Sequence, residues 1–215
     1  MPPEPLSTTF PSFEMTGKNA DLHGFAPDKS PIALLLIDVI NDLEFPEGER
    51  LRRFAEPAAR RIAALKRRAR KHRIPTIYVN DNFGRWQSDF NSQVRHCLED
   101  GVRGESIVRL LAPSKDDYFV LKPKHSGFFS TSLDILLEYL EAETLILTGF
   151  AGNLCVLYTA NDAYMRDFKL AVPGDCIASE TREANDYALD QMKRFLKADV
   201  RASSRLRLRT AGKAR

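Results

Sequence analysis

Residues 145–156 have the sequence Leu-Ile-Leu-Thr-Gly-Phe-Ala-Gly-Asn-Leu-Cys-Val. A short apolar run enters a bend with two glycines, and the bend enters a segment expected to be helical over 154–166. The stretch therefore predicts one strand–turn–helix unit with Cys155 in the first helical turn. A thiol there lies near free backbone N–H groups and the positive end of the helix dipole, which favour a nucleophilic thiolate. Acyl transfer is accordingly the leading chemistry.

The same alternation of strand and helix continues on both sides of this unit. The pattern predicts strands at 31–38, 75–80, 117–121, 144–148 and 169–172, with a possible sixth at 200–203. Helices are expected over 49–73, 91–99, 131–141 and 182–196 as well, and Pro57 is expected to kink or restart the first of them. Such alternation predicts crossover units and a three-layer α/β/α, Rossmann-like sandwich around a mainly parallel sheet.

One domain accounts for most of the 215 residues, of which 43% are hydrophobic. We expect a Pro-, Ser- and Thr-rich N-terminal arm over 1–30, the domain over 31–203 and a basic C-terminal tail over 204–215. Six basic residues and no acidic ones lie in 201–215, so the net charge changes from +3 to −3 without them. Because the remaining chain has no basic patch with interleaved aromatics, we expect a solvated or packed tail and no nucleic-acid partner.

The sequence also predicts where the chain resides. No stretch approaches the roughly 20 apolar residues of a membrane span, and the first residues lack the pattern of a secretory signal. The three cysteines, Cys97, Cys155 and Cys176, are too few and too scattered for a disulfide framework. We therefore expect a cytoplasmic protein without a membrane partner.

Three reactive side chains follow predicted strands. Asp38 ends the first strand, Lys122 follows the third, and Cys155 follows the fourth. Ligands of parallel sheets bind outside the carboxyl ends of the strands, so these residues are the candidates for chemistry. Each also has a structural interpretation: Cys155 as a small core residue, Asp38 as a cap or ion-pair partner, and Lys122 as a surface lysine, with Lys124 as the alternative.

Together the three groups form a plausible catalytic set. An ammonium near a thiol lowers the pKa of the thiol. A carboxylate can accept the thiol proton and pass it to a leaving amine. Backbone N–H groups of the Gly-containing bend can bind a developing oxyanion, an effect worth roughly 3–4 kcal/mol per donor.

Three blocks of this sequence resemble the isochorismatase-like cysteine hydrolases, a family that includes nicotinamidases and N-carbamoylsarcosine amidohydrolases. Leu-Leu-Leu-Ile-Asp-Val-Ile-Asn-Asp over 34–42 resembles the first strand with its aspartate, and Lys-Pro-Lys-His-Ser-Gly-Phe over 122–128 resembles the Lys-x-x-x-Ser-x-Phe block. The third block is 148–156, followed by Thr-Ala-x-Asp-Ala over 159–163. The resemblance covers about 31–203 and supports Lys122 over Lys124.

The resemblance implies a six-stranded parallel sheet between helices and an Asp38–Lys122–Cys155 triad. It also implies a cis peptide bond between Phe150 and Ala151, which places the N–H groups of Ala151 and Cys155 beside the substrate oxygen. Members of the family are commonly dimers or tetramers, so a homodimer or homotetramer is expected. The implied partner is a small amide-like substrate.

Some positions depart from the family pattern. Many members have Gln and Phe where this chain has Ile40 and Leu43, which leaves the substrate open. Nicotinamidases carry an Asp-x-His metal site after the second strand, whereas 80–89 contains no histidine. We therefore expect no metal and no cofactor, and nicotinamide becomes a poorer candidate. His125 is expected to be structural.

Five further residues are candidates for the substrate pocket. Phe83, Trp86 and Phe128 are expected to wall it, or else to pack in the core or an interface. Asn82 and Arg85 are expected to orient a polar substrate, or else to lie on a surface loop.

The predicted reaction is cleavage of the C–N bond of a small amide or carbamoyl compound through a thioester on Cys155, with Asp38 also activating water. Two alternatives stay open. One is a metal-free, isochorismatase-type ether hydrolase that uses Asp38, and the other is a non-catalytic binding protein of the same fold.

Overall fold

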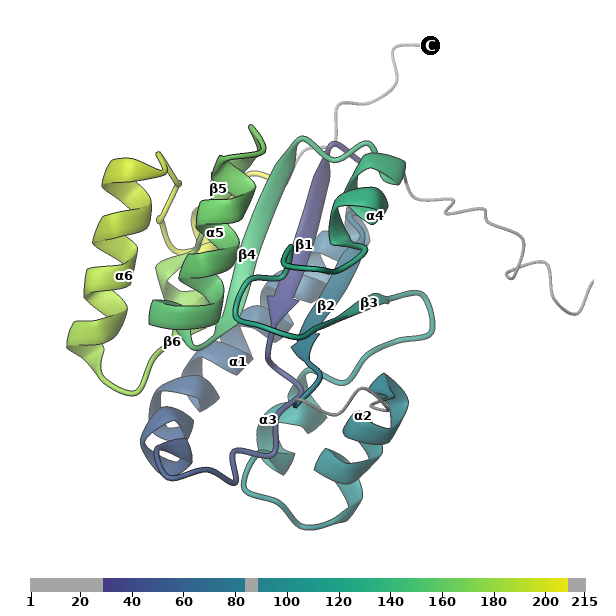
Figure 1. Cartoon of the computed structure of the whole chain (residues 1–215), viewed down its shortest axis with the longest axis vertical. Coiled ribbons are helices and arrows are strands. Elements are labelled where there is room, and N and C mark those ends of the chain that lie inside the picture. The colour runs from purple at the N-terminus through teal and green to yellow at the C-terminus, as the bar shows by residue number, and fades with distance from the viewer. Residues whose placement is uncertain (1–28, 84–88, 209–215) are drawn as a thin grey trace, which may run out of the picture.

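The computed structural model describes residues 29–83 and 89–208. Strands and helices alternate along the chain (Figure 1). The strands are β1 (Ile32–Ile37), β2 (Thr76–Asp81), β3 (Tyr118–Lys122), β4 (Thr144–Phe150), β5 (Lys169–Ala171) and β6 (Ile177–Ala178). The α-helices are α1 (Gly48–Lys71), α2 (Phe90–Glu99), α3 (Glu105–Leu110), α4 (Leu133–Tyr139), α5 (Leu157–Tyr164) and α6 (Arg182–Phe195). A π-helical turn, η2 (Gly152–Val156), precedes α5, and the 3-10 turns are η3 (Gly174–Cys176) and η4 (Ser203–Arg205).

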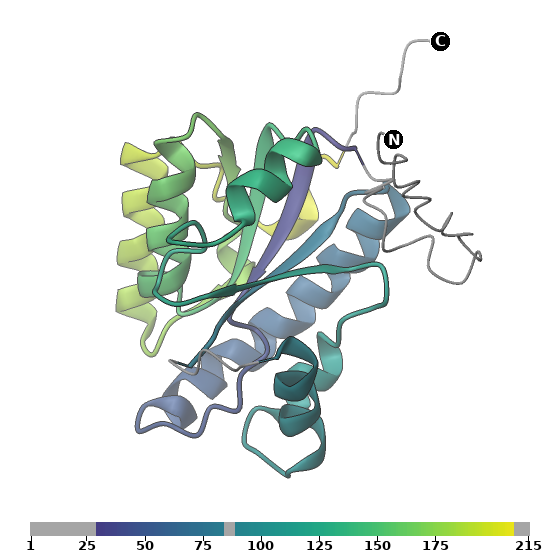
Figure 2. The same cartoon turned by 45° about the vertical axis from the view of Figure 1, so that its right-hand side comes forward.

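The strands form one six-stranded sheet in the order β3-β2-β1-β4-β5, and β6 pairs with β4. Every strand pairing is parallel. Helix α1 covers one face, and α4, α5 and α6 cover the other, which the two views show as layers on opposite sides of the sheet (Figures 1 and 2). The predicted three-layer α/β/α class with a mainly parallel, six-stranded sheet is therefore confirmed.

The apolar run of β1 explains why the sheet is covered on both faces. Successive side chains of a strand point to opposite faces. Leu34 and Leu36 accordingly pack with α1, whereas Ala33, Leu35 and Ile37 pack with the helices of the other layer. All five are fully buried. Along α1, the buried positions recur at steps of three and four, and the charged positions lie on the opposite side.

Three local expectations differ in part from the structure. Helix α1 is continuous through Pro57, so it does not restart there. The sixth strand lies at 177–178, whereas the expected strand at 200–203 has only a neighbouring single bridge between Ala171 and Asp199. Two-residue strands carry too little pattern to be detected in a sequence. The helix expected at 154–166 is present as α5, but its expected first turn belongs to the π-helical turn η2.

The chain remains attached to the domain beyond residue 203. The guanidinium of Arg68 on α1 donates hydrogen bonds to the carbonyl oxygens of Ser203 (2.7 Å) and Leu206 (2.8 Å). Leu206 and Leu208 are buried in the same apolar cluster as α1. The first residues of the predicted tail therefore pack on the domain. The division into an arm, a domain and a tail stays a prediction.

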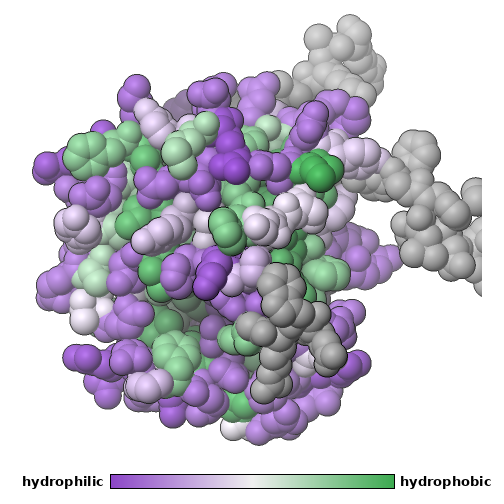
Figure 3. Space-filling view, in the orientation of Figure 1, coloured by the Kyte–Doolittle hydropathy of each residue, from purple (hydrophilic) through white to green (hydrophobic). Residues whose placement is uncertain are grey.

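The surface on the side of α4 and α5 is mostly polar, with small apolar patches among the polar side chains (Figure 3). Ile135, Tyr139 and Tyr158 are among the exposed apolar residues of these helices. In the part of the chain that the structure describes, no helix combines the length and the apolar character that crossing a bilayer requires.

Candidate active site

Asp38 leaves the carboxyl end of β1 in a conformation that fixes its side chain. Its backbone N–H donates to the carbonyl oxygen of Val79 (2.9 Å), and its φ angle is 51°, in the left-handed region that few residues other than glycine adopt. The carboxylate Oδ1 accepts a hydrogen bond from the backbone N–H of Asp81 (2.8 Å). β1 and β2 thus hold this carboxylate at the edge of the sheet.

Lys122 is the last residue of β3, and its side chain is fully buried. Its ammonium lies 2.9 Å from Oδ2 of Asp38 and 3.5 Å from Oδ2 of Asp81. The same Nζ atom is 3.6 Å from Sγ of Cys155. The structure therefore brings Asp38, Lys122 and Cys155 from three different strand ends to one place. A buried ammonium requires such partners, because removing it from water without them is costly.

Cys155 lies in a π-helical turn, η2, between β4 and α5. The peptide bond between Phe150 and Ala151 is cis, and η2 follows directly. Within this turn, the N–H groups of Leu154 and Val156 donate to the carbonyl oxygen of Ala151, and that of Asn153 donates to Oγ of Ser179. Among the described residues, the N–H of Cys155 has no hydrogen-bond partner outside its own turn.

The electrostatics of the site keep the thiol protonated at rest. Burial and the negative charge of Asp38 raise the pKa of Cys155, and together they outweigh the opposing effect of Lys122. Lys122 lowers the pKa of the thiol as expected, but the net thiolate that sequence reasoning inferred from it does not result. The sequence could not show how deeply Cys155 is buried, and burial is the largest cause of the rise.

The two ionised groups stabilise each other. Burial leaves the pKa of Asp38 above its usual value, although the charge of Lys122 and hydrogen bonds to Cys155, Lys122 and Asp81 oppose that rise. Burial lowers the pKa of Lys122, but the charges of Asp38 and Asp81 and the hydrogen bond to Asp38 oppose burial, and the pKa is left above its usual value. The arrangement is a carboxylate that can accept a proton from a neutral thiol, with an ammonium fixed between them.

The candidate pocket residues have different surroundings. Asn82 is buried, and its backbone N–H donates to the carbonyl oxygen of Lys122 (3.0 Å), whereas Phe83 is about half exposed. Phe128 is buried in the core, where its ring contacts Phe168. Arg85 and Trp86, the remaining two, lie outside the described residues.

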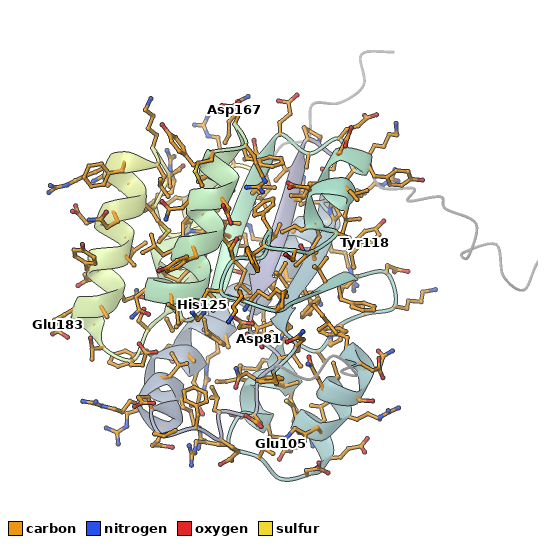
Figure 4. The ribbon with its side chains drawn as sticks, viewed as in Figure 1. Asp81, Glu105, Tyr118, His125, Asp167 and Glu183 are labelled. Carbon is orange, nitrogen blue, oxygen red and sulfur yellow. The ribbon has the colours of Figure 1, made fainter. Side chains whose placement is uncertain are left out.

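Two residues beside the triad were not assigned a role there from the sequence. Asp81 ends β2 and contacts both Asp38 and Lys122. Ligands of parallel sheets bind outside the carboxyl ends of the strands, so the same argument that selected Asp38 and Lys122 could have selected Asp81. His125, expected to be structural, has its Nδ1 atom 3.9 Å from Sγ of Cys155. Figure 4 shows His125 and Asp81 near the carboxyl end of β1.

No group of three or more His, Cys, Asp or Glu side chains in residues 29–83 and 89–208 is arranged to hold a metal ion. The three cysteines are not joined in disulfides.

Known proteins are similar to this chain in sequence and in fold. Residues 32–202 match the Isochorismatase domain. The uncharacterized isochorismatase family protein YaaI of Bacillus subtilis is 44% identical over 172 residues, which cover 80% of this chain and 94% of that protein. An isochorismatase-like hydrolase from Alkaliphilus metalliredigens has a similar structure, with a TM-score of 0.66 and 26% identity over 82% of this chain and 94% of that one.

A solved N-carbamoylsarcosine amidase from Thermoplasma acidophilum is also similar, with a TM-score of 0.62 and 27% identity, covering 81% of this chain and 98% of that one. The match to the domain spans well over half of the chain, and the match to YaaI covers nearly the whole length of that relative. The chain therefore belongs to the isochorismatase family of hydrolases.

Proposed function

We propose that this hydrolase is a cysteine amidohydrolase that cleaves the C–N bond of a small amide or carbamoyl compound through a thioester on Cys155. The observation that carries the proposal is the contact of one buried ammonium with both the thiol, at 3.6 Å, and the Asp38 carboxylate, at 2.9 Å. The similarity to an N-carbamoylsarcosine amidase supports the choice of a C–N bond.

The acylation step follows from the charges at the site. Asp38 accepts the proton of the Cys155 thiol as the sulfur attacks the carbonyl carbon, so the thiolate forms only when substrate is present to use it. The protonated Asp38 then gives that proton to the departing ammonia or amine, and the acyl group stays on Sγ as a thioester.

Backbone and side-chain groups each have a part in this step. Lys122 favours the ionised form of Asp38 and orients its carboxylate between turnovers. The N–H groups of Ala151 and Cys155 stabilise the oxygen that becomes negative, by roughly 3–4 kcal/mol per donor. Because Lys122 is fully buried, it acts on the other two residues and does not contact the substrate.

A screen for ammonia release across small primary amides, ureas and carbamoyl compounds tests the proposal. On any substrate found, Cys155→Ala is expected to abolish turnover, and a trapped thioester should be detectable by intact-protein mass spectrometry. Cys97→Ala is the matched control, because Cys97 is also a buried free thiol but lies on α2. A Cys155→Ala protein with full activity would contradict the proposal and favour an ether hydrolase that uses Asp38.

A further inference from the structure

The outer face of the C-terminal half of α1 is strongly basic. No aspartate or glutamate occurs in residues 57–80, which contain this half of the helix and the strand that follows it. Arg60, Arg67 and Lys71 repeat at steps of seven and four, so they share one side of the helix, and Arg61 lies next to Arg60. All four side chains are exposed.

The segment from η4 onward brings two more arginines to this part of the molecule. Arg68 of α1 donates hydrogen bonds to two backbone carbonyl oxygens of the segment, which therefore lies beside the helix. Leu206 and Leu208 are buried in the same apolar cluster as α1. Arg205 and Arg207 alternate with these leucines and are exposed. Two stretches that are far apart in the sequence thus form one positively charged surface.

The cations of this surface have no acidic partner in the part of the chain that the structure describes. The nearby carboxylates are engaged elsewhere: Asp117 pairs with Lys66, and Asp199 pairs with Arg201. Like charges without counter-charges repel one another and destabilise the folded chain. A helix dipole favours cations only in the last turn, so it accounts for Lys71 and not for the others. We call the six side chains the basic surface: Arg60, Arg61, Arg67, Lys71, Arg205 and Arg207.

The chemistry and the length of the basic surface fit a row of phosphates. Five of its six side chains are arginines, and a guanidinium binds phosphate through two parallel hydrogen bonds. From Arg60 to Lys71 the helix rises by about 16 Å. This rise corresponds to about five nucleotide steps along one strand of a duplex, at about 3.4 Å per step.

Other features of the surface argue against two further kinds of polyanion. No large apolar side chain of residues 57–73 is exposed, whereas helices that bind anionic bilayers insert such side chains. The basic surface also contains no aromatic ring on which an unpaired base could stack. Because the opposite face of α1 packs on the sheet, the helix cannot enter a groove and can contact only the backbone of a duplex.

We propose that the basic surface binds the phosphate backbone of duplex nucleic acid without regard to base sequence. The expectation of no nucleic-acid partner treats the tail by itself, whereas the folded chain adds the cations of α1 to it. The basic surface lies toward the amino ends of the strands, because α1 ends at Lys71 and β2 begins at Thr76. It is therefore separate from the candidate active site at the carboxyl ends, and the inference does not depend on the proposed function.

Fluorescence anisotropy with the full chain and a labelled DNA duplex of about 20 base pairs tests the proposal between about 50 and 150 mM salt. Six phosphate contacts predict that log K falls with log salt with a slope of about −5 or steeper. The double variant Arg67→Gln and Arg207→Gln removes one cation from each segment. We expect its slope to be shallower by about 2, and its binding at about 0.1 M salt to be about 50-fold weaker.

The double variant Arg182→Gln and Lys193→Gln is the matched control, because it removes two exposed cations from α6 on the other face of the sheet. Its affinity and slope should equal those of the wild type. An equal loss in this control would overturn the proposal, because net charge and not the basic surface would then govern binding. A wild-type protein that does not bind the duplex at about 50 mM salt would also overturn it. So would tighter binding to phosphatidylserine vesicles than to the duplex at equal phosphate concentration, which would make this face a membrane surface.

Discussion

Replacing Asp38 by asparagine should increase the thiolate fraction of Cys155 and yet abolish turnover. The variant removes one negative charge beside the thiol and retains the Lys122 ammonium, 3.6 Å from Sγ. Because the charge of Asp38 raises the pKa of Cys155, its removal should lower that pKa and increase the thiolate fraction. Turnover should nevertheless be lost, because no group remains on the buried side to move the proton.

The size of the pKa change follows from Coulomb's law. Asp38 hydrogen-bonds to Cys155, so its charge lies within about 4 Å of the sulfur; at an effective dielectric constant of about 20, unit charges at that distance interact by about 4 kcal/mol, or about three pKa units. Solvent and the rearrangement of neighbouring groups reduce this upper value. We therefore expect a decrease of at least about one pKa unit, which is about a tenfold higher thiolate fraction at neutral pH.

Alkylation by iodoacetamide measures this change. Nucleophilicity falls as the thiol pKa falls, so a tenfold gain in thiolate should give an alkylation rate about threefold higher or more. In the wild type, the raised pKa of Cys155 should confine fast alkylation to alkaline pH. In Asp38→Asn, the alkylation rate should begin to increase at a lower pH. Peptide mass spectrometry assigns the label to Cys155. The same analysis separates the label on Cys155 from any label on the other two buried free thiols, Cys97 and Cys176.

Asp42→Asn is the matched control, because Asp42 lies in the same loop after β1 but pairs with the exposed His96. Its alkylation rate should equal that of the wild type. In Asp38→Asn, hydrolysis of a substrate from the ammonia-release screen should fall by about 100-fold or more. An Asp38→Asn protein that alkylates no faster than the wild type would refute the electrostatic account of the thiol.

Two further predictions concern stability. Hydrogen bonds to Asp100 and Asp42 raise the pKa of His96, so the stabilisation that the imidazolium supplies is fully present below the unfolded-state pKa and is lost as pH rises through the folded-state pKa. His96→Gln should therefore lower the melting temperature more at about pH 6 than at about pH 9. The difference should correspond to at most about 1 kcal/mol in the free energy of unfolding, because His96 is half-exposed. Equal decreases at the two pH values would contradict this prediction. Gly149→Ala should cost about 3 kcal/mol or more in urea unfolding, because Gly149 has a φ of +122° and an added Cβ would lie 2.0 Å from the carbonyl oxygen of Ile37. Gly101→Ala, with a φ of +68° and open space around it, should cost only about 1 kcal/mol, and equal losses for the two variants would exclude the steric argument.

The sequence by itself determined the layers of the fold. An apolar run such as 32–37 is buried whichever strands pair with it, so the hydrophobic pattern alone identifies the central strands. Strands buried on both faces are typical of parallel sheets covered by helices, and this gives the α/β class of the fold. The apolar stripe of α1 likewise identifies a helix and its buried face. Positions with weak local patterns were missed: β6 has two residues, and η2 differs from an α-helix only in its hydrogen bonds.

The sequence also indicated which residues meet at the candidate site. Asp38 and Lys122 each lie at the carboxyl end of a strand, and Cys155 follows a third strand. Parallel strands place those ends at a single edge of the sheet. The homodimer or homotetramer, the cytoplasmic location and the absence of a cofactor stay predictions.

Only the tertiary structure decided the charge balance around the thiol. Whether Lys122 leaves the pKa of Cys155 below its usual value depends on its distance from Asp38, which is 2.9 Å, and on the burial of all three groups. The position of His125 against the sulfur depends in the same way on Tyr158 and Asp162 of α5. Electrostatic interactions vary with distance and with local dielectric, and a linear sequence specifies neither for residues more than 30 positions apart until the chain has folded.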